Sequence, residues 1–299
     1  MKKAFLAVFL FSALLVLNVP TFGQSIKELK RQAKKGNAEA QYNLGMCYYE
    51  GIGVEYSYSE AVKLFRLAAY ADAQYALRAC YYNGEGVEQS YSEAVKLFRL
   101  AAEQGYADAQ YALGACYFYG KGVEQSYTEA VKWCRMAAEQ GNANAQYNLG
   151  VIYLKGIGVE SLYSEAVKYF QLAAEQGNAD AQYELGLCYE NGDGVELSPS
   201  EAARWYLKSA ENGNLESQYK LGLCYYNGTG VERSYTEAVS WFKRAEERGH
   251  VAAMYMLGVC YENGHGVNQS KTDALNWYMK AGNKGHKEAR TAYERLENR

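Results

Sequence analysis

The cysteines are the first residues in this sequence whose type and spacing are compatible with chemistry. Six of the seven recur at one position of a repeated pattern: Cys47, Cys80, Cys116, Cys188, Cys224 and Cys260. A disulfide needs Cα atoms within roughly 7 Å, whereas equivalent positions in stacked helix pairs lie near ~10 Å apart. Ile152 takes the same position in one copy, which indicates apolar packing. We therefore expect buried free thiols, with Cys134 alone in a second helix, and no metal site.

The three histidines are the other candidates for metal or acid–base chemistry. His250, His265 and His286 all lie towards the end of the chain, and none stands at zinc-ligand spacing from a cysteine or a glutamate. They also form no Ser-His-Asp or Cys-His set with residues elsewhere. We expect solvated histidines at two helix starts and in one loop.

Two short motifs match catalytic patterns without the context that those patterns need. Ser240-Trp-Phe-Lys243 matches the Ser-x-x-Lys of penicillin-recognising enzymes, but neither Ser-Asp-Asn nor Lys-Thr-Gly accompanies it. The Gly-x-Gly of every copy follows a helical pattern, whereas a phosphate-binding loop follows a strand. The sequence predicts no enzyme and no cofactor.

Tyrosine offers binding chemistry instead. The chain has 30 Tyr against 9 Phe and 4 Trp. A tyrosine ring can be buried while its hydroxyl stays near water, which suits a thin fold with much half-buried surface. Rigid rings of this kind are good anchors for a peptide, a partner helix or a sugar.

A repeat of fixed length positions these residues. The motif Ala-Gln-Tyr-x-Leu-Gly recurs along the chain, and its first residue falls at Ala40, Ala73, Ala109, Ala145, Ala181, Ser217, Ala253 and, in a worn last copy, Ala289. The spacing is 33 residues once and 36 thereafter. A constant period in this range indicates a stacked supersecondary unit.

Each period contains two helical patterns. In the first, Ala109, Leu113 and Tyr117 fall on one face of a helix that ends at Gly120. The second begins with a capping box, which recurs as Ser57/Glu60, Ser90/Glu93, Ser126/Glu129, Ser198/Glu201 and Ser234/Glu237. Leu162 breaks this box in the fourth copy. A single pair cannot bury its own apolar face, so we predict an all-α solenoid of seven antiparallel helix pairs with a capping helix at each end.

The pattern Ala-x-x-Leu-Gly-x-x-Tyr-x-x-Gly-x-Gly-Val, followed by Glu-Ala-Val and Ala-Ala-Glu-Gln-Gly, resembles the SEL-one-like repeat, a relative of the tetratricopeptide repeat. The resemblance covers about residues 26–299. It implies a right-handed superhelix whose first helices line the concave side, and it implies an adaptor that assembles other proteins. Cysteine-rich relatives pair cysteines from two helices, and this chain lacks the second set. Some exported relatives are described as β-lactamases.

The resemblance also places the candidate binding residues. A column of aromatic and varied residues is expected to face the groove: Tyr49, Tyr82, Phe118, Leu154, Glu190, Tyr226 and Glu262, with Tyr119 beside it. Next to it runs a constant ladder: Tyr42, Tyr75, Tyr111, Tyr147, Tyr183, Tyr219 and Tyr255. We predict that the varied column binds a partner. The ladder either anchors the ligand or fills space between helices.

A third column, mostly acidic, starts the first helices. Its members are Glu39, Asp72, Asp108, Asn144, Asp180, Glu216 and Ala252. These side chains either contact a ligand or favour the positive N-terminus of the helix.

One junction is irregular. Three residues are missing near Tyr70, and Arg78 replaces a glycine that the other copies share. We expect Arg78 to overpack the helix pair, at a cost of about 1–3 kcal/mol, and a kink or weak joint near Tyr70. A tolerated deletion is the alternative.

The N-terminus predicts export. Lys2 and Lys3 precede an apolar run over residues 4–17, and small residues follow Pro20, as in a signal peptide spanning 1–23. This run is short for a membrane span, no later run is long enough, and no cysteine follows for a lipid anchor.

The formal net charge is −3, and −5 without the two lysines, so we expect no nucleic-acid partner.

We therefore predict a single solenoid over 24–299, with repeats near 37–69, 70–105, 106–141, 142–177, 178–213, 214–249 and 250–285 and a cap over 286–299. The predicted function is that of a periplasmic or secreted scaffold, monomeric, that binds a protein or peptide on the concave face. An envelope glycan-binding module or a β-lactamase-like hydrolase is the alternative.

Overall fold

The computed structural model describes residues 25–68 and 71–298, and over these ranges every regular element is an α-helix. The chain divides into two compact units, with the division inside one helix between Leu149 and Gly150; residues 157–159 belong to the first unit. The first unit contains α1 (Ile26–Lys34), α2 (Ala38–Glu50), α3 (Tyr58–Ala68), α4 (Ala71–Asn83), α5 (Tyr91–Glu103), α6 (Ala107–Tyr119) and α7 (Tyr127–Glu139). The helix α8 (Ala143–Lys155) contributes to both units.

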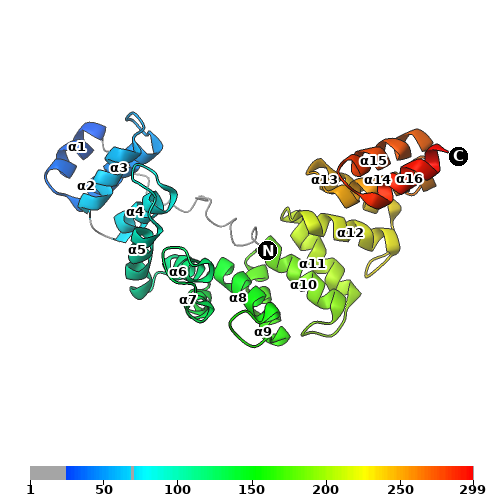
Figure 1. Cartoon of the computed structure of the whole chain (residues 1–299), viewed down its shortest axis with the longest axis horizontal. Coiled ribbons are helices and arrows are strands. Elements are labelled where there is room, and N and C mark those ends of the chain that lie inside the picture. The colour runs from blue at the N-terminus through cyan, green and yellow to red at the C-terminus, as the bar shows by residue number, and fades with distance from the viewer. Residues whose placement is uncertain (1–24, 69–70, 299) are drawn as a thin grey trace. The chain divides into compact units, whose positions relative to one another are not determined.

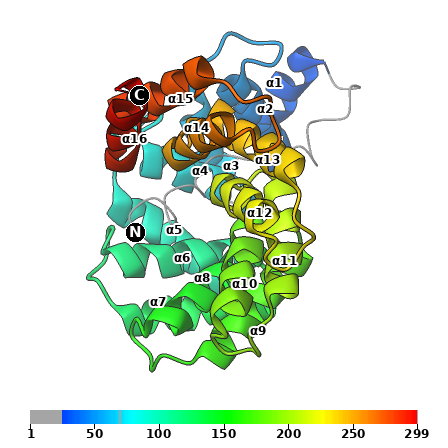
Figure 2. The same cartoon turned by 90° about the vertical axis from the view of Figure 1, so that its right-hand side faces the viewer.

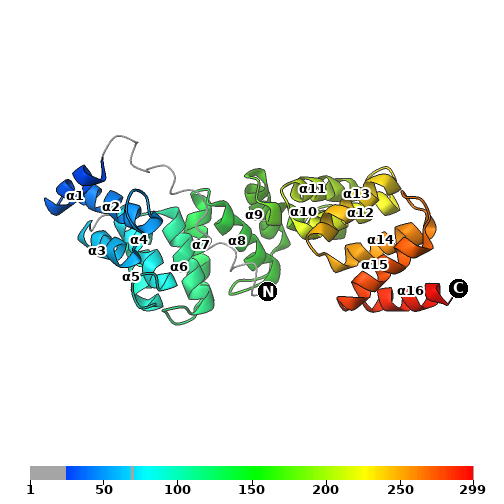
Figure 3. The ribbon, with the colours of Figure 1, turned by 90° about the horizontal axis from the view of Figure 1, so that it is seen from above.

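The second unit continues the same alternation of helices (Figure 1). It contains α9 (Tyr163–Glu175), α10 (Ala179–Asn191), α11 (Pro199–Glu211), α12 (Leu215–Asn227), α13 (Tyr235–Glu247), α14 (Val251–Asn263), α15 (Lys271–Asn283) and α16 (Lys287–Glu297). Each helix packs on the next along the chain from α1 to α7 in the first unit and from α9 to α16 in the second, as Figure 3 shows for α14, α15 and α16. The predicted seven helix pairs with a capping helix at each end are thus confirmed, with α1 and α16 as the caps.

The even-numbered helices α2 to α14 are the first helices of the repeats, and their ends follow from the sequence. Asn37, Asn178 and Asn214 each accept a hydrogen bond from the backbone N–H three residues on, which satisfies a donor that the helix cannot pair. The helices end at glycines with positive φ, such as Gly51 and Gly120 at +72° and +65°.

The odd-numbered helices α3 to α15 are the second helices, and serine begins most of them. The backbone N–H of Glu93 donates to Ser90, and Ser126, Ser198 and Ser234 act in the same way. Leu162 takes this position before α9 and gives no side-chain cap, as the sequence predicted. Glu60, Glu93, Glu129 and Glu201 of the boxes form ion pairs with the basic residue three positions on, for example Glu93 with Lys96.

A glycine in the first helix lets the second helix approach closely. A Cβ added at Gly45 would lie 2.6 Å from Cε1 of the Phe65 ring, and one at Gly150 would lie equally close to Phe170. Gly186, Gly222 and Gly258 face Tyr206, Phe242 and Tyr278 in the same manner. The rings are almost fully buried and form the centre of each helix pair.

A second close approach joins neighbouring repeats. In four of the Gly-x-Gly loops the second glycine lies on the backbone of the first residue of the preceding repeat's second helix: Gly86 on Tyr58, Gly122 on Tyr91, Gly230 on Pro199 and Gly266 on Tyr235. Any Cβ there would overlap backbone atoms. The loop therefore places its middle residue against the preceding repeat.

Arg78 lies inside the first unit. Its side chain is only 7% exposed, and its Cζ lies 3.2 Å from the ring centroid of Tyr75 and 4.6 Å from that of Phe98. The cost of overpacking at this position stays a prediction. The expected kink near Tyr70 falls outside the described residues.

All seven cysteines are free and buried, as predicted. Burial raises the pKa of each thiol, to about 12 for Cys80 and Cys134. Among the described residues, no helix is long and apolar enough to cross a membrane.

Candidate partner-binding site

The varied column lies at the C-terminal ends of the first helices, against the next repeat. In the first unit, the Tyr49 hydroxyl donates to Oε2 of Glu85 at 2.6 Å, and its ring lies 4.9 Å from that of Tyr58. Burial, and then the hydrogen bond to Glu85, raise the pKa of Tyr49 far above its ordinary value, so the hydroxyl stays a donor.

Tyr82 repeats this arrangement with the charge reversed. Its hydroxyl accepts a 2.9 Å hydrogen bond from Nζ of Lys121, and its ring meets that of Tyr91 edge-on at 4.9 Å. The same ammonium lies within 5.2, 5.3 and 6.0 Å of the ring centroids of Tyr82, Tyr91 and Tyr119. The cation thus occupies a site formed by three tyrosine rings.

Phe118 extends this aromatic group. Its ring lies 5.1 Å from that of Tyr119 and 5.2 Å from that of Tyr127, edge-on in both cases. Three of the predicted site residues, Tyr82, Phe118 and Tyr119, are therefore brought together in the first unit, around Lys121.

The second unit contains a related cluster. The Tyr226 hydroxyl and Nδ1 of His265 are 2.9 Å apart, and the His265 ring stacks flat on Tyr235 at 4.2 Å. Tyr226 meets Tyr235 edge-on at 5.1 Å. His265 is thus a loop residue, as expected, but its ring is held between two tyrosines.

Two glutamates of the varied column make a different contact. Glu190 accepts hydrogen bonds from the Tyr206 hydroxyl and from Nζ of Lys220, the latter at 2.8 Å. Glu262 accepts from the Tyr278 hydroxyl at 2.7 Å and from Nη2 of Arg295 at 2.7 Å. In both repeats the second-helix ring is tyrosine, whereas phenylalanine stands there in the repeats that carry Tyr49, Tyr82 or Tyr226.

The constant ladder lies deeper, among the packed rings. Tyr42, Tyr111 and Tyr147 are buried, whereas Tyr75, Tyr183 and Tyr219 keep part of their surface exposed. Ring centroids of Tyr42, Tyr183 and Tyr219 lie 6.0 Å from those of Phe65, Tyr206 and Phe242. The Tyr111 hydroxyl accepts from Nδ2 of Asn148. These contacts favour the packing interpretation of the ladder.

The column at the helix starts links neighbouring repeats. Oδ1 of Asp108 accepts from Nδ2 of Asn142 at 2.8 Å, Asp180 accepts from Asn214 at 2.9 Å, and Glu216 lies 3.3 Å from Nε2 of His250. In each case the partner is the residue that caps the next repeat's first helix. These residues have a structural role that the sequence analysis did not foresee.

The expectation of solvated histidines is wrong for the two helix starts. His250 and His286 accept the cap hydrogen bonds of α14 and α16 through Nδ1. Their rings stack on Tyr219 and Tyr255 at 4.5 and 4.7 Å, and their side chains are only 10% and 19% exposed. The sequence placed them at helix starts but gave no sign of the stacking.

The sequence analysis also missed the middle residue of each Gly-x-Gly loop. Glu85, Lys121 and His265 supply the polar partners of Tyr49, Tyr82 and Tyr226. The available signal is that this position varies between repeats while both flanking glycines stay constant: Ile52, Glu85, Lys121, Ile157, Asp193, Thr229 and His265.

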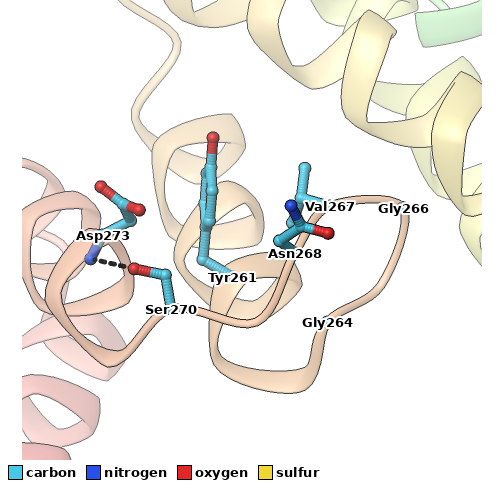
Figure 4. Close-up of a pocket in the computed structure, with 7 residues that line it drawn as sticks. All are labelled: Tyr261, Gly264, Gly266, Val267, Asn268, Ser270 and Asp273. Atoms are coloured by element: carbon cyan, nitrogen blue, oxygen red, sulfur yellow. Dashed lines mark hydrogen bonds between the residues drawn. The ribbon is translucent and has the colours of Figure 1, made fainter.

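A catalytic serine, a metal site and a small-molecule pocket have little support in the described part of the chain. Ser240 and Lys243 are both exposed on α13, and neither hydrogen-bonds to the other. No group of three His, Cys, Asp or Glu side chains there is placed to hold a metal ion. A shallow pocket lies beside the last Gly-x-Gly loop, lined by Tyr261, Val267 and Asn268 among others (Figure 4), but the hydroxyl of its Ser270 already accepts the cap hydrogen bond from Asp273.

Helix pairs that follow one another within each unit (Figure 2), with a capping helix before the first pair and after the last, define an α-helical repeat protein of the solenoid type. The Sel1 repeat model matches residues 38–72, 69–106, 107–142, 143–178, 179–214, 215–250 and 251–286. The chain therefore belongs to the Sel1 repeat family. Proteins of this family are generally non-catalytic scaffolds for protein–protein interactions.

Solved structures agree with this assignment. A protective antigen present in uropathogenic Escherichia coli strains, which displays an SLR fold, is 37% identical with a TM-score of 0.89. The match covers 91% of this chain and 59% of that antigen, so the chain spans well under two thirds of its length. A Sel1 repeat protein from Oxalobacter formigenes is 31% identical with a TM-score of 0.75, over 91% of this chain and 79% of that one. No curated protein matches the chain.

Proposed function

We propose that this chain is an exported, monomeric scaffold that binds a protein or peptide along the varied column of its first helices. The observation that carries the proposal is a column of side chains, half-buried except for the exposed Glu190, that changes from repeat to repeat within a constant frame. Framework positions of a repeat are fixed by packing, so the positions that vary are available for recognition.

The geometry of the column supports recognition by preorganised rings. Tyr82 and Phe118 are held by edge-on contacts to neighbouring tyrosines, and the Lys121 ammonium donates a hydrogen bond to the Tyr82 hydroxyl. Rings that are already fixed lose little conformational entropy on binding. A lysine beside tyrosine hydroxyls favours a ligand that offers both apolar groups and hydrogen-bond acceptors, as a peptide does.

Export is supported by the N-terminal segment and by one relative. Residues 1–23 have the charge and apolar run of a signal peptide. The Escherichia coli relative is described as a protective antigen, which fits a protein located outside the cytoplasm. Immunoblotting of cytoplasmic, periplasmic and culture-medium fractions tests the location, and a chain of full length found only in the cytoplasm contradicts it.

An affinity pull-down with the chain lacking residues 1–23 tests the binding proposal. The test variant replaces Tyr49, Tyr82, Phe118 and Tyr226 by alanine. The matched control replaces four exposed apolar residues of the second helices, Leu67, Leu100, Met136 and Leu172, by alanine. Circular dichroism checks that both variants are folded. A third variant with Tyr49→Phe, Tyr82→Phe and Tyr226→Phe keeps the rings and removes the hydroxyls.

We expect a specific protein to be retained by the wild type and the control and lost with the alanine variant. If all variants capture the same protein equally well, the varied column is not its binding site. Binding to peptidoglycan that survives high salt and is lost with the alanine variant favours a glycan ligand instead. Hydrolysis of a β-lactam that Ser240→Ala abolishes contradicts a purely scaffolding function.

A further inference from the structure

The first capping helix, α1, is strongly basic. Together with the residue that follows it, α1 carries five cations against a single carboxylate. All five cations are exposed: Lys27, Lys30, Arg31, Lys34 and Lys35. The remainder of the first unit, over 36–149, has eight cations against thirteen carboxylates. An excess of positive charge in this unit is therefore found in its first helix alone.

The packing of α1 does not require these cations. Leu29 and Ala33 are buried where α1 packs on α2, and they account for the apolar side of the helix. The negative end of the helix favours Lys34 and Lys35, but it gives no advantage to Lys27 in the first turn. Like charges three and four residues apart also repel each other and weaken a helix. The cluster thus lowers the stability of the helix that carries it.

The need to cap the stack does not explain the charge either. A terminal helix of a repeat protein needs a polar outer face for solubility. The cap at the other end of the chain, α16, meets this need with three cations and three carboxylates. Mixed charges are sufficient for a cap, so the excess of cations in α1 indicates a second role.

Most of this charge is available to a partner. Nε of Arg31 donates to Oε2 of Glu28 at 2.7 Å, so the only arginine of the cluster is already paired. Within the described ranges none of the four lysines forms an ion pair, and Lys30 lies 5.7 Å from the ring centroid of Tyr48. The exposed charges are thus ammonium groups on flexible stems.

The residue types favour an extended negative surface over a specific protein partner. A lysine ammonium is a hydrated point charge, whereas arginine usually binds the carboxylates of a protein partner. Protein interfaces are depleted in lysine and have apolar or aromatic side chains at their centre. Over Ile26–Lys34 no large apolar side chain is exposed. The face offers charge alone.

We propose that the exposed face of α1 binds the surface of a lipid bilayer that contains anionic headgroups. Lys27, Arg31, Lys34 and Lys35 stand at i, i+4, i+7 and i+8, so they share one side of the helix and can approach a plane of phosphates together. The apolar side of α1 is buried against α2, so the helix lies on the surface without entering it. Each cation near such a surface strengthens binding roughly fivefold. This face is separate from the varied column, so either assignment can fail without the other.

Sedimentation with vesicles tests the proposal. The chain lacking residues 1–23 retains every residue that the structure describes. Vesicles of phosphatidylcholine are compared with vesicles of equal parts of phosphatidylcholine and phosphatidylglycerol. The test variant carries Lys27→Gln, Lys34→Gln and Lys35→Gln. The matched control removes the same charge from exposed positions on second helices of the same unit, by Lys63→Gln, Lys96→Gln and Lys132→Gln.

Two further checks accompany these variants. Circular dichroism compares the helix content of all proteins, so that unfolding of α1 is recognised. A variant with arginine at the three positions of the test variant keeps the charge and should bind the vesicles as the wild type does.

We expect the wild type and the control to bind the vesicles with phosphatidylglycerol, more weakly as the salt concentration rises, and to leave the neutral vesicles unbound. The test variant should bind about 100-fold more weakly, because it lacks three cations. Equal losses in the test variant and the control would show that net charge, and not α1, governs binding, and would overturn the proposal. Equal binding to both kinds of vesicle, or binding to neither, would overturn it as well. Capture of an acidic protein that only the test variant loses, without binding to vesicles, would assign α1 to a protein partner instead.

Discussion

The hydroxyl of Tyr49 donates a 2.6 Å hydrogen bond to Oε2 of Glu85, 36 residues further along the chain. It joins the end of α2 to the loop after α4, across the boundary between two repeats. A half-buried bond to a charged acceptor contributes about 1.5–3 kcal/mol, more than a neutral pair does.

We predict that Tyr49→Phe and Glu85→Gln are coupled. Tyr49→Phe removes the bond and Glu85→Gln removes the charge of its acceptor, so the double variant should be less destabilised than the sum of the two by about 1 kcal/mol. Urea unfolding of the four proteins measures the coupling. Tyr106→Phe, an exposed tyrosine of the same unit, serves as control and should add to Glu85→Gln without coupling. Strict additivity of Tyr49→Phe would show that the bond does not hold the repeats together.

Replacing Gly122 and Gly141 by alanine should distinguish the cost of backbone strain from the cost of a lost contact between repeats. Gly122 and Gly141 both have positive φ, so alanine costs each about 1–2 kcal/mol. Gly122 also lies on the backbone of Tyr91, whereas a Cβ at Gly141 meets nothing within 4 Å. Gly122→Ala should therefore lower the melting temperature clearly more than Gly141→Ala does. Equal losses would contradict the contact.

The missing cap of α9 offers a stabilising change. Leu162 has the extended backbone of the other N-caps, and it is exposed. Leu162→Ser should accept a hydrogen bond from the N–H of Glu165 and stabilise the fold by about 1 kcal/mol. Leu172→Ser, an equally exposed change inside the same helix, is the control and should bring no gain. Thermal unfolding compares the two, and a loss of stability in Leu162→Ser would refute the prediction.

Glu190 should stabilise the second unit in a pH-dependent way. Burial alone would raise the pKa of Glu190, but hydrogen bonds from Lys220 and Tyr206 outweigh it and hold the pKa below its ordinary value of 4.5. A carboxyl with a lowered pKa stabilises the fold above pH 4.5, and this contribution is lost as the pH falls through the lowered value. Glu190→Gln should therefore unfold at a lower urea concentration than the wild type at pH 7, and the two midpoints should converge as the pH falls below 4.5. A gap that is constant with pH would contradict the charge-based contacts.

Glu184, on the same helix, should have the opposite effect. Burial raises the pKa of Glu184, so its charged form destabilises the fold. The penalty appears as the pH rises above 4.5 and is complete above the raised pKa. Glu184→Gln should stabilise the protein at pH 7 and lose this advantage near pH 4. Glu175→Gln, an exposed change on α9, is the control and should have little effect at either pH.

The local structure of this chain could be predicted from its sequence, because it depends on residues close together in the chain. The serine caps, the glycine ends and the period that places Cys116 and Leu113 in the core are all local patterns. The absent cap at Leu162 belongs to the same class.

The contacts between repeats could not be predicted in this way. Tyr82 meets Lys121, and Tyr226 meets His265, only because a glycine places the intervening loop on the preceding helix. That placement depends on packing across 39 residues. Arg78 shows a related limit. Its volume argues against insertion between two helices, whereas in the structure its guanidinium carbon lies close to the rings of Tyr75 and Phe98.

The Gly-x-Gly loops also assign two properties of a stacked protein, the spacing between repeats and the contact between them, to different residues. The glycines set the spacing between neighbouring repeats, while the residue between them sets how strongly each boundary holds: a carboxylate at Glu85, an ammonium at Lys121, an imidazole at His265. We expect a single substitution at this position to change the contact at one boundary and to leave in place the glycines that set the spacing. Within each unit, neighbouring repeats therefore share one spacing but differ in the contact that joins them.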